Sequence, residues 1–186
     1  KRYAEAVKIE KSYVEPASRL ELGNIIPNAG EEAGKSVVEY EKLTLPAWNR
    51  PGVSVIIPVY NQFDYTYNCV KSIIKNSGDI AYEIIIADDC STDVTREIEK
   101  VIENIRVEVT EKNVRFLLNC NNAAKHARGE YILFLNNDTQ VQKDWLRPLV
   151  ELIERDDSIG MVGSKLIYPD GFLQEAGGIV WKDASA

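Results

Sequence analysis

Residues 131–138 read Tyr-Ile-Leu-Phe-Leu-Asn-Asn-Asp, a continuous apolar run that ends in two amides and a carboxylate. A short run with no polar alternation is typical of a strand that is buried on both faces. Earlier runs of the same kind lie at residues 53–57, 84–87 and 107–109, and apolar residues at helical spacing separate them. Strands that alternate with helices in this way predict an α/β fold, with a mostly parallel sheet covered by helices on both faces.

Three helices are expected where apolar residues recur at helical spacing. Two further strands are expected toward the end of the sequence, at residues 161–167 and 173–180, joined by a turn at Asp170-Gly171. The residues that mark the three helices are Tyr67, Val70 and Ile74, then Ile98, Val101 and Ile102, and finally Trp145, Leu149 and Leu152.

The first fifty residues differ from the rest of the chain. Residues 1–50 hold eight Lys or Arg and eight Glu, so the net charge of −7 belongs wholly to residues 51–186. Helices are expected at 3–14 and 31–43, with a loop rich in turn-forming residues between them and a linker around 46–52. The sequence therefore predicts a helical appendage, or the tail of a preceding domain, followed by a separate α/β domain.

The composition describes a folded protein and excludes several other classes. The chain has 186 residues, of which 45% are hydrophobic and 27% are charged, unlike collagen-like or disordered chains. No apolar run approaches the roughly 20 residues that a membrane-spanning helix needs. The net charge of −7 disfavours a non-specific nucleic-acid surface, because such surfaces need clustered Lys and Arg.

Three widely spaced cysteines, Cys69, Cys90 and Cys120, favour a reducing compartment. The lone histidine, His126, is expected to be structural or solvated rather than catalytic.

Polar residues follow the expected strands at the edge where α/β sheets bind their ligands. Asp88 and Asp89 come directly after the second strand, and the Asn-Asn-Asp segment 136–138 comes after the fourth. Adjacent carboxylates repel one another unless a cation, a helix N-terminus or a hydrogen-bonding ligand compensates. The segment 88–93 is also consistent with capping of the next helix, and both interpretations stay open. One carboxylate and two amides at 136–138 suit an oxygen-ligated Mg or Mn ion.

Three motifs occur in order along the chain: Pro-Val-Tyr-Asn at 58–61, Asp-Asp-Cys-Ser-Thr-Asp at 88–93, and Ala-Arg-Gly-Glu-Tyr-Ile-Leu-Phe-Leu-Asn-Asn-Asp-Thr at 127–139. Together with residues 163–171 and 176–178, they closely resemble the N-terminal half of family 2 glycosyltransferases. The resemblance implies the Rossmann-like GT-A fold, which binds a nucleotide-diphosphate sugar and a divalent metal, Mg or Mn. The Asn-Asn-Asp form resembles rhamnosyltransferase-like members. The α/β part would then be the N-terminal part of a catalytic domain, truncated at its C-terminus.

The resemblance also implies the donor-binding residues. Pro58, Val59 and Tyr60 match the segment that lines the nucleoside pocket, and Asn61 follows them as a further donor-binding residue. Asp89 matches the carboxylate that accepts a hydrogen bond from the base. The aspartate that precedes it is expected to be a structural partner.

Asn137 and Asp138 match the second half of the DXD-type motif. Asp138 is expected to ligate the metal that bridges the diphosphate, and Asn137 to face the ribose or the sugar. Asn113 is also expected to bind the donor, although the family commonly has Asn-x-Gly-Phe where this chain has Asn-Val-Arg-Phe. Arg115 in that motif either reaches a phosphate or lies solvated at the surface.

The reaction that the resemblance implies is transfer of a sugar to an acceptor hydroxyl with inversion. The acceptor is expected to be a glycan, a lipid-linked molecule or another hydroxyl compound in polysaccharide biosynthesis. In this family the general base lies well downstream, so we expect it beyond Ala186 and expect this segment alone to be inactive. The alternative is a non-catalytic nucleotide-sugar or carbohydrate-binding module. The expected location is cytoplasmic, with peripheral attachment at the inner membrane face as an option.

Overall fold

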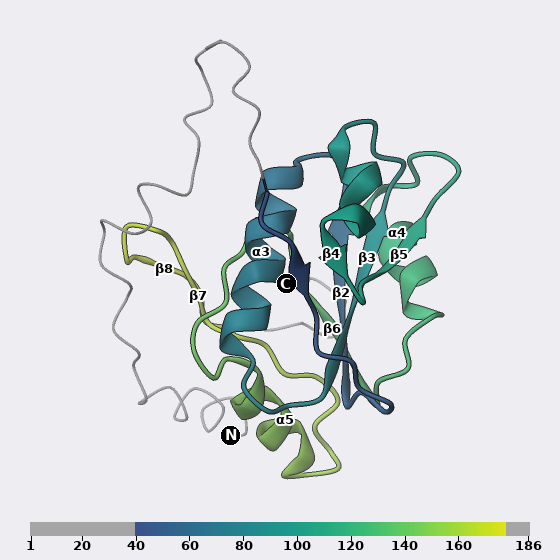
Figure 1. The fold of residues 1–186 in the computed structure, drawn as a ribbon. Coiled ribbons are helices and arrows are strands. Elements are labelled where there is room, and N and C mark those ends of the chain that lie inside the picture. Colours follow the sequence, from purple (N-terminus) through teal and green to yellow (C-terminus); the bar gives the residue numbers. More distant parts are fainter. Residues whose placement is uncertain (1–39, 178–186) are drawn as a thin grey trace. The chain divides into compact units, whose positions relative to one another are not determined.

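The computed structural model describes residues 40–177 (Figure 1). The described chain divides into two compact units, which meet in the sequence after Asp144; each is described by itself. The helix expected at 3–14 and most of the helix expected at 31–43 lie outside the described residues, as do residues 178–180 of the last expected strand.

A four-stranded sheet forms the centre of the first unit. The strands lie in the order β5-β3-β2-β6, and all neighbours run parallel (Figure 1). The strand bounds are Val53–Val59 for β2, Tyr82–Asp88 for β3, Arg106–Val109 for β5 and Tyr131–Phe134 for β6. The first four apolar runs are therefore strands, and the predicted α/β fold with a mostly parallel sheet is confirmed.

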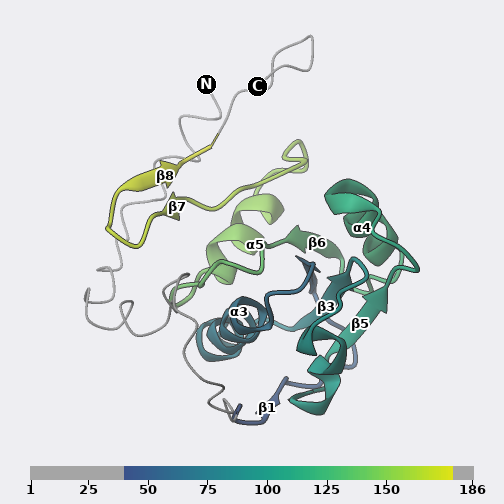
Figure 2. The same cartoon turned by 90° about the horizontal axis from the view of Figure 1, so that it is seen from above.

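Helices cover both faces of this sheet, because its two central strands carry almost only buried apolar side chains. Helix α4 (Arg115–Ala124) packs on one face, where Ala123 joins Ile56 and Ile85 in a buried cluster. Helix α3 (Phe63–Asn76) lies on the opposite face (Figure 2) and buries its own apolar stripe there. The core therefore sits in two layers, one on each side of β2 and β3.

The prediction of a helix from the apolar residues at 98–102 is wrong. This segment instead contains the end of a 3-10 helix, η2 (Val94–Lys100), followed by the short strand β4 (Ile102–Glu103). Ile98 and Ile102 are each only 1% exposed, although they belong to different elements. The helical spacing therefore reflects burial across a change of structure, which a run this short cannot distinguish from one helix face.

Residues 40–45 are part of the first unit. Strand β1 (Leu43–Thr44) pairs in parallel with β4, where the end of a helix was expected. The ring of Tyr40 lies 4.7 Å from that of Phe63 and 5.0 Å from that of Tyr67, both on α3. The compact unit includes this segment, so the boundary expected near residue 51 lies inside the unit.

A hydrogen-bond network joins the beginnings of β2, β3 and β6 at the amino-terminal edge of the sheet. The Glu83 carboxylate accepts hydrogen bonds from the Ser54 hydroxyl at 2.7 Å and from the backbone N–H and Nε of Arg128 at 2.7 and 2.8 Å. Gly129 approaches so closely that an added Cβ would lie 2.5 Å from the Ser54 backbone nitrogen. The Arg-Gly pair of the third motif therefore fixes the start of β6, which is a structural role.

The second unit contains helix α5 (Leu146–Glu154) and a short antiparallel pair, β7 (Leu166–Ile167) and β8 (Leu173–Glu175). The Asp170-Gly171 turn joins the two strands, and its glycine has a φ of 88°, which L side chains rarely adopt. The strand expected at 161–167 is limited to its last two residues, because only these pair with β8. In the part of the chain that the structure describes, no helix is both long and apolar enough to cross a membrane.

Gly129→Ala should destabilise the chain by about 1–3 kcal/mol, because the added methyl group overlaps backbone atoms of Ser54 inside the sheet. The free energy of unfolding from urea denaturation measures the effect. Gly163→Ala is the matched control, since a Cβ added there meets no atom within 4 Å. Equal stability of the two variants would contradict the close contact at Gly129.

The Glu83 network should make the stability depend on pH. Burial alone raises the pKa of this carboxyl, but the hydrogen bonds from Ser54 and Arg128 and the charge of Arg128 outweigh it and lower the pKa. A lowered folded-state pKa contributes stability that is present above the unfolded pKa of about 4.3 and is lost as the pH falls through the folded pKa. Glu83→Gln should therefore lower the free energy of unfolding at neutral pH by ~1–3 kcal/mol, and by less at about pH 3.

Urea denaturation of this variant at several pH values between neutral and acid checks the prediction. Glu99→Gln is the control, because Glu99 is exposed and should change the stability little at any pH. A loss of stability from Glu83→Gln that stays constant with pH would refute the role of the ionised carboxylate.

Candidate functional site

Four loops gather at the carboxyl-terminal edge of the sheet, one after each strand, because all four strands run in the same direction. Backbone strain is concentrated there. The described residues include six non-glycine residues with positive φ. Three of them, Asn61, Gln62 and Cys90, lie in the loops after β2 and β3, and a fourth, Arg115, is the first residue of α4. Such conformations cost about 1–3 kcal/mol each and cluster at functional sites. The strained backbone therefore indicates that a functional site lies at the carboxyl-terminal edge of the sheet.

Asn61 joins the first two loops. Its side-chain Oδ1 accepts hydrogen bonds from the N–H groups of Thr92 and Asp93 at 2.7 and 3.2 Å, and its own N–H donates to the Ser91 hydroxyl at 2.7 Å. Asp93 in turn caps η2 by accepting a hydrogen bond from the Thr95 N–H at 2.9 Å. Asn61 thus holds the loops after β2 and β3 together. The interpretation of this segment as a helix cap holds for Asp93.

The first of the two adjacent aspartates after β3, Asp88, is only 1% exposed. Its Oδ1 accepts a hydrogen bond from the Ser91 N–H at 2.8 Å, whereas its Oδ2 has no hydrogen-bond partner among the described residues. Asp88 therefore shapes the loop, and it leaves one buried acceptor without a partner among the described residues.

The second aspartate, Asp89, holds the beginning of helix α4. Its Oδ1 accepts hydrogen bonds from the Thr110 hydroxyl at 3.0 Å and the Val114 N–H at 2.7 Å, and its Oδ2 accepts one from the Arg115 N–H at 2.8 Å. Hydrogen bonding and the helix dipole both favour a carboxylate in this place. Asp89 is only 4% exposed. Because three of the about four lone-pair sites of its carboxylate are occupied, any contact with a base would have to use the remaining one.

The segment expected to line the nucleoside pocket is only partly open. The Tyr60 side chain is 53% exposed, whereas Val59 is buried in the core and Pro58 is half-buried. The Val59 carbonyl accepts a hydrogen bond from the Asp89 N–H at 2.8 Å, which joins the ends of β2 and β3. Tyr60 therefore offers the largest free surface of the three to a planar ligand.

The Asn-Asn-Asp segment forms a turn after β6. The Asn136 carbonyl accepts a hydrogen bond from the Thr139 hydroxyl at 2.6 Å, and the Asn137 amide donates to the Thr66 hydroxyl on α3 at 3.0 Å. Asp138 is exposed and forms no hydrogen bond or ion pair with any described residue. The turn therefore presents one free carboxylate, while Asn137 is anchored through its nitrogen.

A metal at this turn would take few of its ligands from the protein. Within residues 40–177, no group of three or more His, Cys, Asp or Glu side chains is placed to hold a metal ion. The free carboxylate of Asp138 nevertheless fits Mg or Mn, which keep several waters and bind through one or two carboxylates plus phosphate oxygens. The remaining ligands would have to come from water and from the phosphates of a bound nucleotide.

The thiol nearest to this turn belongs to Cys69. Burial raises the pKa of the Cys69 thiol to about 12, and its sulfur lies 3.7 Å from the Asn136 carbonyl oxygen. A thiol with so high a pKa stays protonated at neutral pH and is a poor metal ligand and nucleophile. Cys69 therefore contributes packing rather than chemistry.

The third loop carries Asn113 and Arg115. Asn113 is exposed, and Asp89 holds the N–H groups of the two residues that follow it. Arg115 has a φ of 67° at the position where the family commonly has glycine. Arg115 therefore has the left-handed backbone conformation that glycine adopts more easily.

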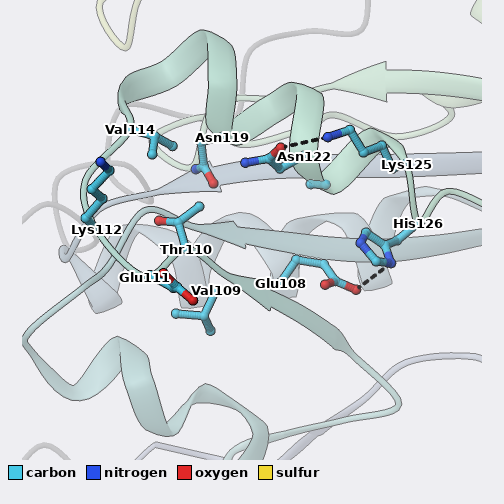
Figure 3. Close-up of a pocket in the computed structure, with 11 residues that line it drawn as sticks. Glu108, Val109, Thr110, Glu111, Lys112, Val114, Asn119, Asn122, Lys125 and His126 are labelled. Atoms are coloured by element: carbon cyan, nitrogen blue, oxygen red, sulfur yellow. Dashed lines mark hydrogen bonds and ion pairs between the residues drawn. The ribbon is translucent and has the colours of Figure 1, made fainter.

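A groove of about 400 Å³ lies between β5 and α4 (Figure 3). Its polar lining includes Glu108, Lys112, Asn119 and His126, and none of the expected donor-binding residues lines it. His126 Nδ1 lies 3.5 Å from Glu108 Oε1, which fits a structural role for the histidine. The groove therefore borders the expected site, because Thr110 and Val114 line it and both donate hydrogen bonds to Asp89.

Sequence reasoning missed Asn119. This residue is 2% exposed on α4 and donates a hydrogen bond to the Ala87 carbonyl at 2.6 Å, next to the two aspartates. The only signal was an amide at a buried position of the helix. The left-handed backbone of Cys90 was also missed, and the residue type carries no signal for it.

Comparisons with known proteins identify the family. Residues 54–180 match the family described as "Glycosyl transferase family 2". The "Putative teichuronic acid biosynthesis glycosyltransferase TuaG" of Bacillus subtilis (strain 168) is 39% identical over 127 residues, which are 66% of this chain and 50% of that protein. The "O-antigen biosynthesis protein RfbC" of Myxococcus xanthus is 31% identical over 156 residues, which are 82% of this chain and 12% of that protein. The chain thus spans half or less of the length of these relatives.

A solved structure titled "Crystal structure of S. aureus TarS 1-349 in complex with UDP-GlcNAc" is 32% identical to this chain. The alignment covers 55% of this chain and 31% of that chain, with a TM-score of 0.48. The family match itself extends over well more than half of the sequence and includes all four strands of the sheet except the first residue of β2. The chain belongs to glycosyl transferase family 2.

Proposed function

We propose that this chain is the donor-binding half of a glycosyltransferase that moves a sugar from a nucleotide-diphosphate sugar to an acceptor hydroxyl, with inversion and with the help of a divalent metal. The observation that carries the proposal is that Tyr60 and Asp138 are both exposed in the loops after β2 and β6, in a member of this family. These two strands pair directly. One ligand that lies across the edge of the sheet can therefore contact both residues.

The donor is proposed to lie with its base at the β3 side and its diphosphate at the β6 side. Asp89 and Tyr60 would contact the base, and Asn113 would lie near it in the third loop. Asn137 would face the ribose or the sugar through its free carbonyl oxygen, because its nitrogen is held by Thr66. This orientation places the single free carboxylate of Asp138 beside the diphosphate.

Three of the expected donor-binding residues are proposed to act by holding the loops in place. The side-chain oxygen of Asn61 already accepts backbone hydrogen bonds from the loop after β3. Val59 is buried, and Pro58 is half-buried beside it in sequence. Their contribution to donor binding would therefore be a fixed position for Tyr60 and Asp89.

A Mg or Mn ion held by Asp138 and the diphosphate would stabilise the negative charge of the departing nucleotide. The proposed role of Asp138 is to provide a carboxylate that no protein group engages beside the diphosphate. The hydrogen bond from Asn137 to Thr66 keeps the turn in place. No acidic residue of the described chain is proposed as the general base.

The names of the relatives support a polysaccharide as the product. They refer to teichuronic acid biosynthesis, to O-antigen biosynthesis and, for TarS of Staphylococcus aureus, to a poly(ribitol-phosphate) beta-N-acetylglucosaminyltransferase. The proposed acceptor is accordingly a hydroxyl of a growing glycan or of its lipid-linked precursor. The Asn-Asn-Asp turn is the basis for proposing a rhamnosyltransferase-like member. The free cysteines support a cytoplasmic location, with peripheral attachment at the membrane.

Nucleotide-diphosphate sugars should raise the melting temperature of the chain, and more so when Mn is present. A ligand at about 100 times its Kd stabilises a protein by roughly 2.7 kcal/mol, which a thermal-shift screen detects. The screen compares UDP-, dTDP-, GDP- and CDP-sugars with and without Mn. A chain whose melting temperature responds to none of them would not have the proposed function.

Asp138→Ala should remove the gain in donor affinity that Mn provides and leave the metal-free affinity nearly unchanged. The reason is that the exposed carboxylate of Asp138 forms no hydrogen bond or ion pair with any other described residue. Isothermal titration calorimetry with a UDP-sugar, with and without Mn, measures both affinities. Asp157→Ala, a change of an exposed aspartate in the second unit, is the control. The metal assignment fails if Asp138→Ala keeps the full effect of Mn.

A further inference from the structure

Arg115 combines a strained backbone with an unused side chain. Its φ of 67° is one that arginine rarely adopts, at a cost of about 1–2 kcal/mol. In this conformation its N–H donates to Asp89 Oδ2 at 2.8 Å. The guanidinium is exposed and forms no ion pair or hydrogen bond with any described residue. A long cation is thus held at the candidate site without a protein partner.

The position of Arg115 on the sheet favours the base over the diphosphate as its partner. The strand order is β5-β3-β2-β6, and Arg115 follows β5 while Asp138 follows β6. Three strand spacings of about 4.8 Å separate these two edges, or roughly 14 Å. Asp89, by contrast, is within hydrogen-bonding distance of the Arg115 backbone. The guanidinium therefore belongs to the end of the site where the proposed function puts the base.

The hydrogen bonds of Asp89 limit which base it can read. A carboxylate has about four lone-pair sites, and Thr110, Val114 and Arg115 already occupy three of those of Asp89. One acceptor site is left, on Oδ2. Uracil and thymine present one ring N–H between two carbonyl oxygens, whereas guanine presents two adjacent N–H donors, and cytosine and adenine present a ring acceptor there.

We propose that Arg115 is a base-specificity residue, whose guanidinium donates a hydrogen bond to a carbonyl oxygen of uracil or thymine while Asp89 accepts the ring N–H beside it. This inference rests on the proposed function and adds the class of donor to it: a uridine or thymidine diphosphate sugar. The backbone and the side chain of Arg115 then act together, because the same residue that occupies one lone pair of Asp89 supplies the complementary donor.

Arg115→Gly is the variant that tests the proposal. Glycine adopts a φ of 67° without strain, so the N–H that bonds to Asp89 is kept and the fold should be at least as stable. NMR titration with uridine, which has no phosphate, and calorimetry with UDP, GDP and CDP measure the affinities. Lys112→Ala removes another exposed cation of the same loop and is the matched control.

The expected result is that Arg115→Gly weakens the binding of uridine and of UDP by the same factor, about 10-fold or more, and reduces the preference for UDP over GDP and CDP. Lys112→Ala should leave all these affinities nearly unchanged. The melting temperature of Arg115→Gly should not fall, which separates lost binding from lost folding.

Several outcomes would overturn the proposal. If Arg115→Gly binds UDP as well as the unmodified chain does, the guanidinium makes no contact. If UDP binds more weakly but uridine does not, the contact is with a phosphate, and if all nucleotides weaken equally, Arg115 does not select the base. An unmodified chain that binds none of these compounds would instead refute the proposed function itself, and the inference with it.

Discussion

The carboxylate of Asp89 is the interaction on which the carboxyl-terminal edge of the sheet depends. It accepts one hydroxyl and two backbone N–H groups from the segment that leads into α4, while its own N–H bonds to the Val59 carbonyl at the end of β2. One residue thus connects two central strands to a helix that begins 26 residues later in the chain. Because the carboxylate is almost fully buried, its removal would leave two backbone N–H groups without an acceptor, which is costly.

The candidate site consists of two kinds of group with different roles. Asn61, Asp88 and Asp89 are engaged in hydrogen bonds within the protein and set the shape of the loops. Tyr60, Asn113, Arg115 and Asp138 are exposed and are the groups available to a ligand. A rigid frame with a few free side chains lowers the conformational entropy that binding must overcome. The strained backbone positions in the same loops fit this division, since only a well-supported loop keeps them.

The sequence predicted the sheet because continuous apolar runs such as residues 53–57 and 84–87 have no other stable place than a strand covered on both faces. It failed at residues 98–102, where a 3-10 helix and a strand bury isoleucines at helical spacing. At the candidate site, it predicted that the paired aspartates and Asp138 lie where strands end at one edge of the sheet, as they do; their roles toward a ligand stay predictions. It could not show that Asp89 holds α4, because the partners of Asp89 lie more than twenty residues along the chain. Nor could it show the left-handed conformation of Arg115, which no local pattern encodes.

The family match begins at Ser54, but the folded unit begins earlier. The Tyr67 hydroxyl donates a hydrogen bond to the Glu41 carbonyl at 3.0 Å, and strand β1 is the one partner that β4 has among the described strands. The family match and the unit of folding therefore have different boundaries. A protein trimmed to the residues of the family match would leave the backbone of Ile102 without its strand partner and would uncover part of α3.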